Sequence, residues 1–135
     1  MNEKHKLAFM DVAQRFADCS TANRLKVGCI CVKDNRVISI GYNGQPSGWD
    51  NVCEDENNIT LSTVIHAEAN MLMKLARSTE SGENGEVFIT HSPCLECSKL
   101  IAISGIKKVY YKNEYRSLDG IEFLKKCNIE IEKLN

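Results

Sequence analysis

The chain has 135 residues, of which 43% are hydrophobic and 26% are charged, and its formal net charge at pH 7 is −1. This composition is typical of a globular protein, and the length predicts a single domain over residues 1–135. The near-neutral charge disfavours a nucleic-acid partner. No stretch reaches the ~18 apolar residues of a membrane span, so we expect no membrane partner either.

The first half of the chain predicts a helix, a hairpin, a loop and a second helix. Apolar residues at helical spacing indicate a helix over residues 4–18, and two apolar runs, 27–32 and 37–42, indicate an antiparallel hairpin. A long polar segment rich in glycine covers residues 41–58, and its length favours a functional loop. A second helical pattern extends over residues 61–77.

The second half alternates short strands with helices. Strands are predicted at 86–90, 108–111 and 129–134, with a short helix at 118–126. The helix between the first two strands should begin with Ser92 as N-cap and Pro93 as its first residue, and it should stop at Gly105. Strands joined by helical crossovers are parallel, so we expect an α/β fold with a five-stranded mixed sheet.

His66, Cys94 and Cys97 offer one imidazole and two thiolates to a metal. Three such ligands leave the fourth tetrahedral position of a zinc ion open, which is typical of a catalytic site. A zinc-bound water has a pKa near ~7, so hydroxide is available at neutral pH. Glu68 is then placed to carry protons rather than to bind the metal. We expect one catalytic Zn²⁺ per chain.

The spacing of these residues constrains the local structure. Cys94 and Cys97 project from one face of the start of a helix, whereas His66 and Glu68 would point ~200° apart on a regular helix. They converge only if their helix begins at about His66, so that two positive helix ends face one metal and favour thiolate. A lone Cys-x-x-Cys is more often a structural or redox pair, and the combination with His-x-Glu favours catalysis.

With these residues the chain resembles the deoxycytidylate (dCMP) deaminases of the cytidine deaminase-like superfamily, especially the compact phage and bacterial forms. The pattern His-x-Glu…Pro-Cys-x-x-Cys is shared by zinc nucleobase deaminases, and the segment Gly-Tyr-Asn-Gly-x-Pro-x-Gly at residues 41–48 is more specific to dCMP deaminases. The resemblance runs from Ser20 to about Val109 and includes the Asn23-Arg24 and Thr90–Cys94 segments.

The resemblance implies a three-layer α/β/α fold and a zinc-dependent enzyme that converts dCMP to dUMP and ammonia, supplying dUMP for thymidylate synthesis. The amphipathic N-terminal pattern, which is not a secretory one, and a Cys-x-x-Cys pair suited to metal predict a cytoplasmic protein, in the host cytoplasm if a phage encodes it. The alternative substrate is dCTP. Two other interpretations are a deaminase of tRNA or single-stranded nucleic acid, which should carry a basic groove, and a non-catalytic zinc module in which Glu68 only supports the fold.

Arg24 is the best candidate for the 5′-phosphate, because a guanidinium matches phosphate oxygens bidentately, although it could be a solvated loop residue. Asn43 is implied to bind the deoxyribose and contact the base, with a turn role as the alternative. Tyr115 is implied to lie near the substrate, and packing is an equal alternative. The remaining candidates for substrate contacts are Ser20 and Asn23, beside Arg24, and the backbone of Ala67 and Ser92, beside the base.

The resemblance also implies a homohexamer that is activated by dCTP and inhibited by dTTP at a separate site, with Mg²⁺ as a companion of the effector nucleotide. The candidate element is the 41–58 loop, with Gly44, Gly48 and Trp49. Trp49 suits a subunit contact or a nucleotide lid, or else it folds back on its own domain.

Cys19 and Cys53 are expected to be buried free thiols. In some phage relatives, cysteines at comparable places join a His and a Glu in a second, structural zinc site. No histidine lies between Cys53 and His66 to complete such a site, so a second zinc site is only the alternative.

Overall fold

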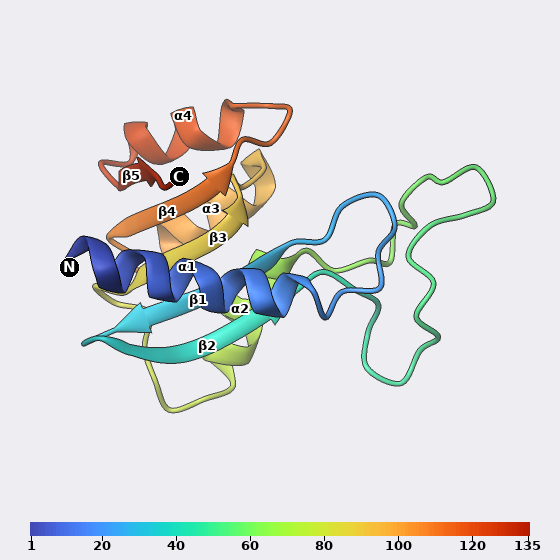
Figure 1. Ribbon diagram of the computed structural model, residues 1–135, viewed down its shortest axis with the longest axis horizontal. Coiled ribbons are helices and arrows are strands. Elements are labelled where there is room, and N and C mark those ends of the chain that lie inside the picture. Colours follow the sequence, from blue (N-terminus) through green and yellow to red (C-terminus); the bar gives the residue numbers. More distant parts are fainter.

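The computed structural model describes residues 1–135, which form four helices and five strands (Figure 1). The helices are α1 (Glu3–Ala17), α2 (Ala67–Ala76), α3 (Leu95–Ile103) and α4 (Asp119–Lys126). The strands are β1 (Gly28–Lys33), β2 (Arg36–Tyr42), β3 (Glu86–His91), β4 (Lys108–Asn113) and β5 (Glu130–Lys133). None of the four helices is long and apolar enough to cross a membrane.

The strands form one sheet in the order β2-β1-β3-β4-β5. β1 pairs antiparallel with β2 and with β3, whereas β3, β4 and β5 run parallel. The parallel pairs follow from the crossovers through α3 and α4, because a tight hairpin can join only antiparallel strands. The predicted mixed sheet is thus confirmed.

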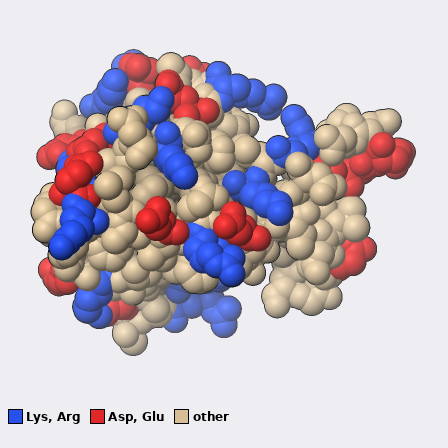
Figure 2. Space-filling view, in the orientation of Figure 1, with Lys and Arg blue, Asp and Glu red and all other residues tan.

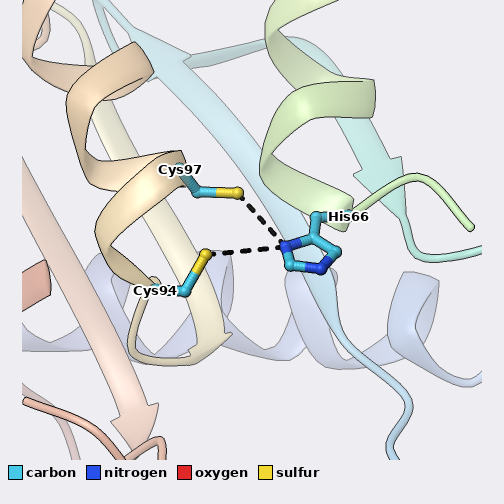
Figure 3. A group of neighbouring side chains, drawn as sticks. All are labelled: His66, Cys94 and Cys97. Atoms are coloured by element: carbon cyan, nitrogen blue, oxygen red, sulfur yellow. Dashed lines mark hydrogen bonds between the residues drawn. The ribbon is translucent and has the colours of Figure 1, made fainter. Parts of the chain in front are cut away.

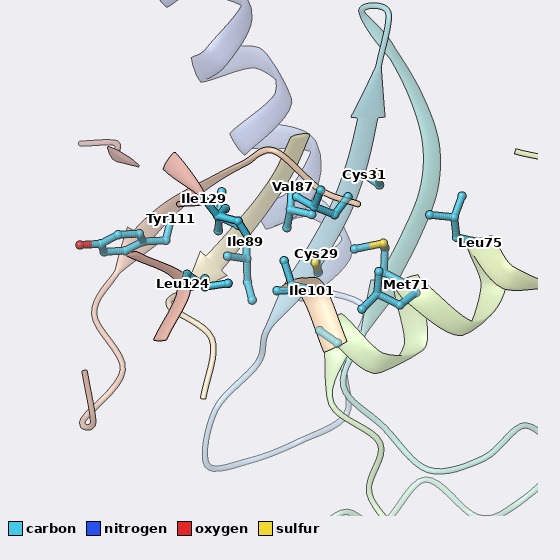
Figure 4. Packing of buried hydrophobic residues seen from close by; sticks show 14 of the residues in the cluster. Cys29, Cys31, Met71, Leu75, Val87, Ile89, Ile101, Tyr111, Leu124 and Ile129 are labelled. Carbon is cyan, nitrogen blue, oxygen red and sulfur yellow. The ribbon is translucent and has the colours of Figure 1, made fainter. Parts of the chain in front are cut away.

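Helices cover both faces of the sheet, which makes three α/β/α layers (Figure 1). Alternate residues of β1 point to opposite faces, as the pleat requires. Ile30 packs with α1, where the ring of Phe88 stacks on Tyr110 with 4.4 Å between centroids. Cys29 faces the other layer and packs among residues of α2, α3 and α4, such as Met71 (Figure 4).

Two helices begin later than predicted. α2 starts at Ala67 with His66 as N-cap, not at residue 61, because Ile65 pairs its backbone with Gly44 (N···O 2.9 and 3.2 Å) and so remains extended. The convergence of His66 and Glu68 had required this start. α3 starts at Leu95 with Cys94 as N-cap, so the prediction of Ser92 as N-cap was wrong.

The reason lies in the contacts of Ser92 with the end of β4. Its backbone N–H donates to the carbonyl O of Asn113 (2.8 Å), and its hydroxyl accepts from the N–H of Tyr115 (2.7 Å). Ser92 therefore continues the sheet rather than capping the helix. At its other end α3 stops before Gly105, whose φ of 85° confirms the predicted C-terminal glycine.

The segment between β2 and α2 projects beyond the sheet (Figure 1). Trp49, Val52 and Ile59 in this segment are 57%, 55% and 57% exposed. On the face of the molecule seen in Figure 2, acidic and basic side chains are intermixed. No broad basic groove crosses this face.

Candidate functional site

His66, Cys94 and Cys97 meet where α2 and α3 begin (Figure 3). The Nδ1 atom of His66 lies 3.6 Å from the Sγ of Cys94 and 3.4 Å from the Sγ of Cys97, and all three ligand atoms lie within 4.8 Å of one another. Tetrahedral bonds of ~2.0–2.3 Å to zinc separate ligand atoms by roughly 3.5 Å. The three residues therefore fit a zinc ion, with His66 binding through Nδ1.

The two thiols differ in acidity. Hydrogen bonds with Cys97 and then with the His66 ring lower the pKa of the Cys94 thiol to about 4. The same contact with Cys94, together with burial, raises the pKa of Cys97. Cys94 is thus ready to bind a cation, whereas Cys97 must release its proton on metal binding, which makes metal affinity depend on pH.

Glu68 lies in the first turn of α2, close to the three metal ligands, and is only 5% exposed. Burial is the main reason that the pKa of its carboxyl rises to about 7. A carboxyl with this pKa can both accept and donate a proton at neutral pH. Its position agrees with a proton carrier beside a metal.

A cavity of about 620 Å³ opens in front of this group. His66, Cys94 and Glu68 line it, and five of the predicted substrate residues line it as well: Arg24, Asn43, Ala67, Ser92 and Tyr115. Residues from five separate parts of the chain thus share one cavity. Its size is within the usual range for small-molecule sites.

Ser20 and Asn23 do not line the cavity. Ser20 is buried, and its hydroxyl donates to the carbonyl O of Asn43 (2.8 Å), so it supports the loop rather than the ligand. The Asn43 side chain accepts from the N–H of Val27 and donates to the carbonyl O of Leu25, each at 2.8 Å. Its backbone is not left-handed, so Asn43 is not the turn residue of the alternative interpretation.

Several further residues line the cavity that the sequence did not single out, and the ionisable ones are Glu54, His91, Glu114 and Arg116. Burial, and then the charge of Lys112, lower the pKa of His91, so that its ring is neutral at pH 7. The buried hydroxyl of Thr90 accepts from the N–H of Gly28 (3.1 Å) and lies 3.2 Å from Nδ1 of His91. In the tautomer that carries its proton on Nε2, Nδ1 accepts a hydrogen bond from that hydroxyl.

No strong sequence signal pointed to Glu54, Glu114 or Arg116. Arg116 lies 5.8 Å from the centre of the Tyr115 ring, and Glu54 is buried at the base of the projecting loop. Only His91 stood in a segment that carried the family resemblance, between Thr90 and Cys94.

Cys19 and the loop residues Gly44, Gly48 and Trp49 do not line the cavity. Cys53 does line it, and its thiol is free and buried. Cys19 is free but exposed, so the expectation of a buried thiol was wrong there. His66, Cys94 and Cys97 are the only close group of three potential metal ligands, and Cys19 and Cys53 have no such partners.

The candidate effector loop is open around its glycines. A Cβ atom added at Gly44 or Gly48 would meet no atom within 4 Å, and Gly48 has a φ of 89°. Trp49 is 57% exposed and does not fold back into the core.

Comparison with known proteins agrees with this site. Residues 3–113 match the family of the cytidine and deoxycytidylate deaminase zinc-binding region. A deoxycytidylate deaminase of Mycobacterium phage D29 is 36% identical over 120 residues, which cover 78% of this chain and 92% of that protein. ComE operon protein 2 of Bacillus subtilis is 36% identical over 113 residues, which cover 81% of this chain. The chain spans only 59% of the length of that protein.

Among solved structures, the dCMP deaminase of cyanophage S-TIM5 in complex with dCMP and dUMP is 48% identical, covers 99% of both chains and superposes with a TM-score of 0.97. The similarity includes the whole sheet and both helix starts that carry the metal ligands. The chain therefore belongs to the zinc-binding cytidine and deoxycytidylate deaminase family.

Proposed function

We propose that this protein catalyses the hydrolytic deamination of dCMP to dUMP and ammonia, and so supplies dUMP for thymidylate synthesis. The observation that carries the proposal is one cavity that contains two metal ligands, the buried Glu68 and Arg24. The similar cyanophage enzyme, solved with dCMP and dUMP, supports the same substrate here.

His66, Cys94 and Cys97 would hold one zinc ion per chain. When bound, zinc supplies the Lewis acidity that brings the pKa of a coordinated water close to neutrality. The three ligands lie at the N-terminal ends of α2 and α3. The positive ends of the two helix dipoles would stabilise the thiolates there.

Glu68 is the proposed proton carrier. In the net reaction one water enters, the bond from C4 to the amino nitrogen breaks, and ammonia leaves. Glu68 would take a proton from the attacking water, give it to N3 of the base, and later help to protonate the departing amine. Its buried carboxyl, with a pKa of about 7, suits both directions of transfer.

The other wall of the cavity would bind the nucleotide. We assign the 5′-phosphate to Arg24, which takes part in none of the salt bridges of the chain and is free to bind an anion. Asn43 would contact the deoxyribose, while the backbone of Ala67 and Ser92 would hold the base. Tyr115 would close the site from the end of β4.

We also propose that the chain assembles as a homohexamer whose activity rises with dCTP and falls with dTTP, with Mg²⁺ bound to the effector phosphates. The exposed Trp49, Val52 and Ile59 on the projecting loop support an interface there. Light scattering tests the assembly, and a monomer at micromolar concentration would contradict it.

The regulation is tested by dCMP kinetics. Sigmoidal dCMP kinetics that become hyperbolic with dCTP would support the regulation, and hyperbolic kinetics indifferent to both nucleotides would contradict it.

A zinc titration tests the main proposal. Metal-free protein receives increasing zinc while dUMP and ammonia are measured in the same samples. We expect the two products in equal amounts and an activity that saturates at one zinc per chain. A protein that holds one zinc per chain and leaves dCMP unchanged would overturn the proposal.

A further inference from the structure

Glu54 connects the projecting loop to the segment that carries Arg24. Its Oε2 atom accepts hydrogen bonds from two consecutive backbone N–H groups, those of Asn23 (3.0 Å) and Arg24 (3.2 Å). Some thirty residues separate the partners in sequence, and Glu54 is only 7% exposed. A buried carboxylate is stable only when such donors satisfy it.

The base of the loop around Glu54 is itself well fixed. The backbone carbonyl O of Cys53 accepts from the N–H of Leu61 (2.9 Å), and the backbone of Glu54 pairs with that of Thr60 in an isolated β-bridge. Asp55 closes the turn beyond, because its carboxylate accepts from the N–H groups of Asn57 (2.8 Å) and Ile59 (3.0 Å). Glu54 therefore belongs to an ordered anchor.

Arg24 lies between this anchor and a second one. On its other side the Asn43 side chain bonds to the backbone of Leu25 and Val27. The backbone around Arg24 is thus fixed from both directions, while the guanidinium has no acidic partner. Fixing the backbone reduces the freedom that the arginine must lose when it binds an anion.

We propose that Glu54 is a positioning residue for the substrate phosphate, acting through the backbone of Arg24. This inference rests on the proposed function, in which Arg24 binds the 5′-phosphate. A carboxylate in direct contact with a phosphate would repel it, whereas one whose oxygen is engaged by two N–H groups can orient the arginine without binding the ligand.

The test compares three single variants of the zinc-loaded protein. Glu54→Ala removes both hydrogen bonds, Glu54→Gln keeps an oxygen acceptor without the charge, and Asp55→Ala removes two similar bonds in the same loop that do not reach Arg24. The readout is kcat/KM for dCMP divided by kcat/KM for deoxycytidine, because general damage to the fold lowers both values equally.

We expect Glu54→Ala to lower this ratio roughly 10-fold, mainly through KM for dCMP, with Glu54→Gln intermediate and Asp55→Ala unchanged. Adding Glu54→Ala to Arg24→Ala should lower the ratio no further, because both act on one contact. Equal losses for dCMP and deoxycytidine would mean that Glu54 supports the fold or the nucleoside site rather than the phosphate contact. An additive double variant would mean that Glu54 acts independently of Arg24. Either result would overturn the proposal.

Amide hydrogen exchange gives a readout that does not depend on activity. The N–H groups of Asn23 and Arg24 should exchange faster in Glu54→Ala than in the parent protein, and should be unaffected in Asp55→Ala. Unchanged exchange in Glu54→Ala would overturn the positioning role. A parent protein that is inactive on dCMP would instead overturn the proposed function, and with it the role of Glu54 in phosphate binding. Amide exchange would still report the hydrogen bonds from Asn23 and Arg24 to Glu54.

Discussion

The Nδ1 atom of His66 lies 3.4 Å from the Sγ atom of Cys97, although 31 residues separate them in the sequence. The two atoms meet because α2 begins immediately after His66 and α3 immediately after Cys94, and these two helix starts face each other (Figure 3). The metal site therefore depends on where two helices begin. Any change that moves the first turn of α2 should alter the site.

Gly41 tests this dependence. A Cβ at Gly41 would lie 2.6 Å from the backbone N of Met71 and would also clash with the carbonyl O of Ala67, so α2 would have to shift. We expect Gly41→Ala to destabilise the protein by ~1–3 kcal/mol in urea unfolding and to weaken zinc retention. Gly44→Ala, where the added carbon meets nothing within 4 Å, is the matched control. Equal stability and zinc content in both variants would refute the close approach.

Glu68→Gln removes the proton carrier and keeps the shape of the side chain. We expect kcat for dCMP to fall by roughly 10²–10⁴, with one zinc still bound per chain, because Glu68 is not a ligand. Ammonia release and metal analysis on one preparation check both parts. Turnover at the parental rate would mean that Glu68 only supports the fold.

Arg24→Ala should raise KM for dCMP strongly and leave the slower turnover of deoxycytidine nearly unchanged. A charge-assisted bidentate contact contributes roughly 1.5–3 kcal/mol, or about 10–150-fold in kcat/KM. Steady-state kinetics with the two substrates measure the difference. If both substrates suffer equally, Arg24 has a structural role.

Removal of zinc should abolish activity and leave the fold in place. The core clusters on both faces of the sheet consist mainly of residues outside the metal site, such as Phe88 on one face and Met71 on the other. Figure 4 shows the cluster that contains Met71. Bound zinc then adds stability by mass action without creating the fold. Circular dichroism after chelation should show the native spectrum at room temperature, and an unfolded spectrum would contradict this account.

Much of this architecture could be predicted from local patterns. Periodicity, apolar runs and helix-end signals together located every helix and strand, and the crossovers predicted which strands are parallel. The requirement that His66 and Glu68 converge predicted the start of α2 better than the apolar pattern did. Leu61, Val64 and Ile65 have helical spacing, but the backbone pairing of Ile65 with Gly44 keeps the chain extended, and such a long-range bond leaves no local signal.

The cavity could be predicted only in part. Arg24, Asn43 and Glu68 belong to segments with recognisable motifs, whereas Glu54 and Arg116 are charged residues of a common surface type. They reach the cavity because separate loops end at the same side of the sheet (Figure 1). Tertiary packing determines that meeting, and spacing along the chain does not reveal it.

A substrate panel on the zinc-loaded wild-type protein measures directly whether dCMP is the preferred substrate. Ammonia release is measured with cytosine, cytidine, deoxycytidine, dCMP, dCTP and an RNA hairpin at matched concentrations. We predict the highest kcat/KM for dCMP, about 10–150-fold above deoxycytidine because of the phosphate contact, and no release from the hairpin. A preference for the hairpin, or no ammonia from dCMP with one zinc bound per chain, would contradict dCMP deamination by this protein.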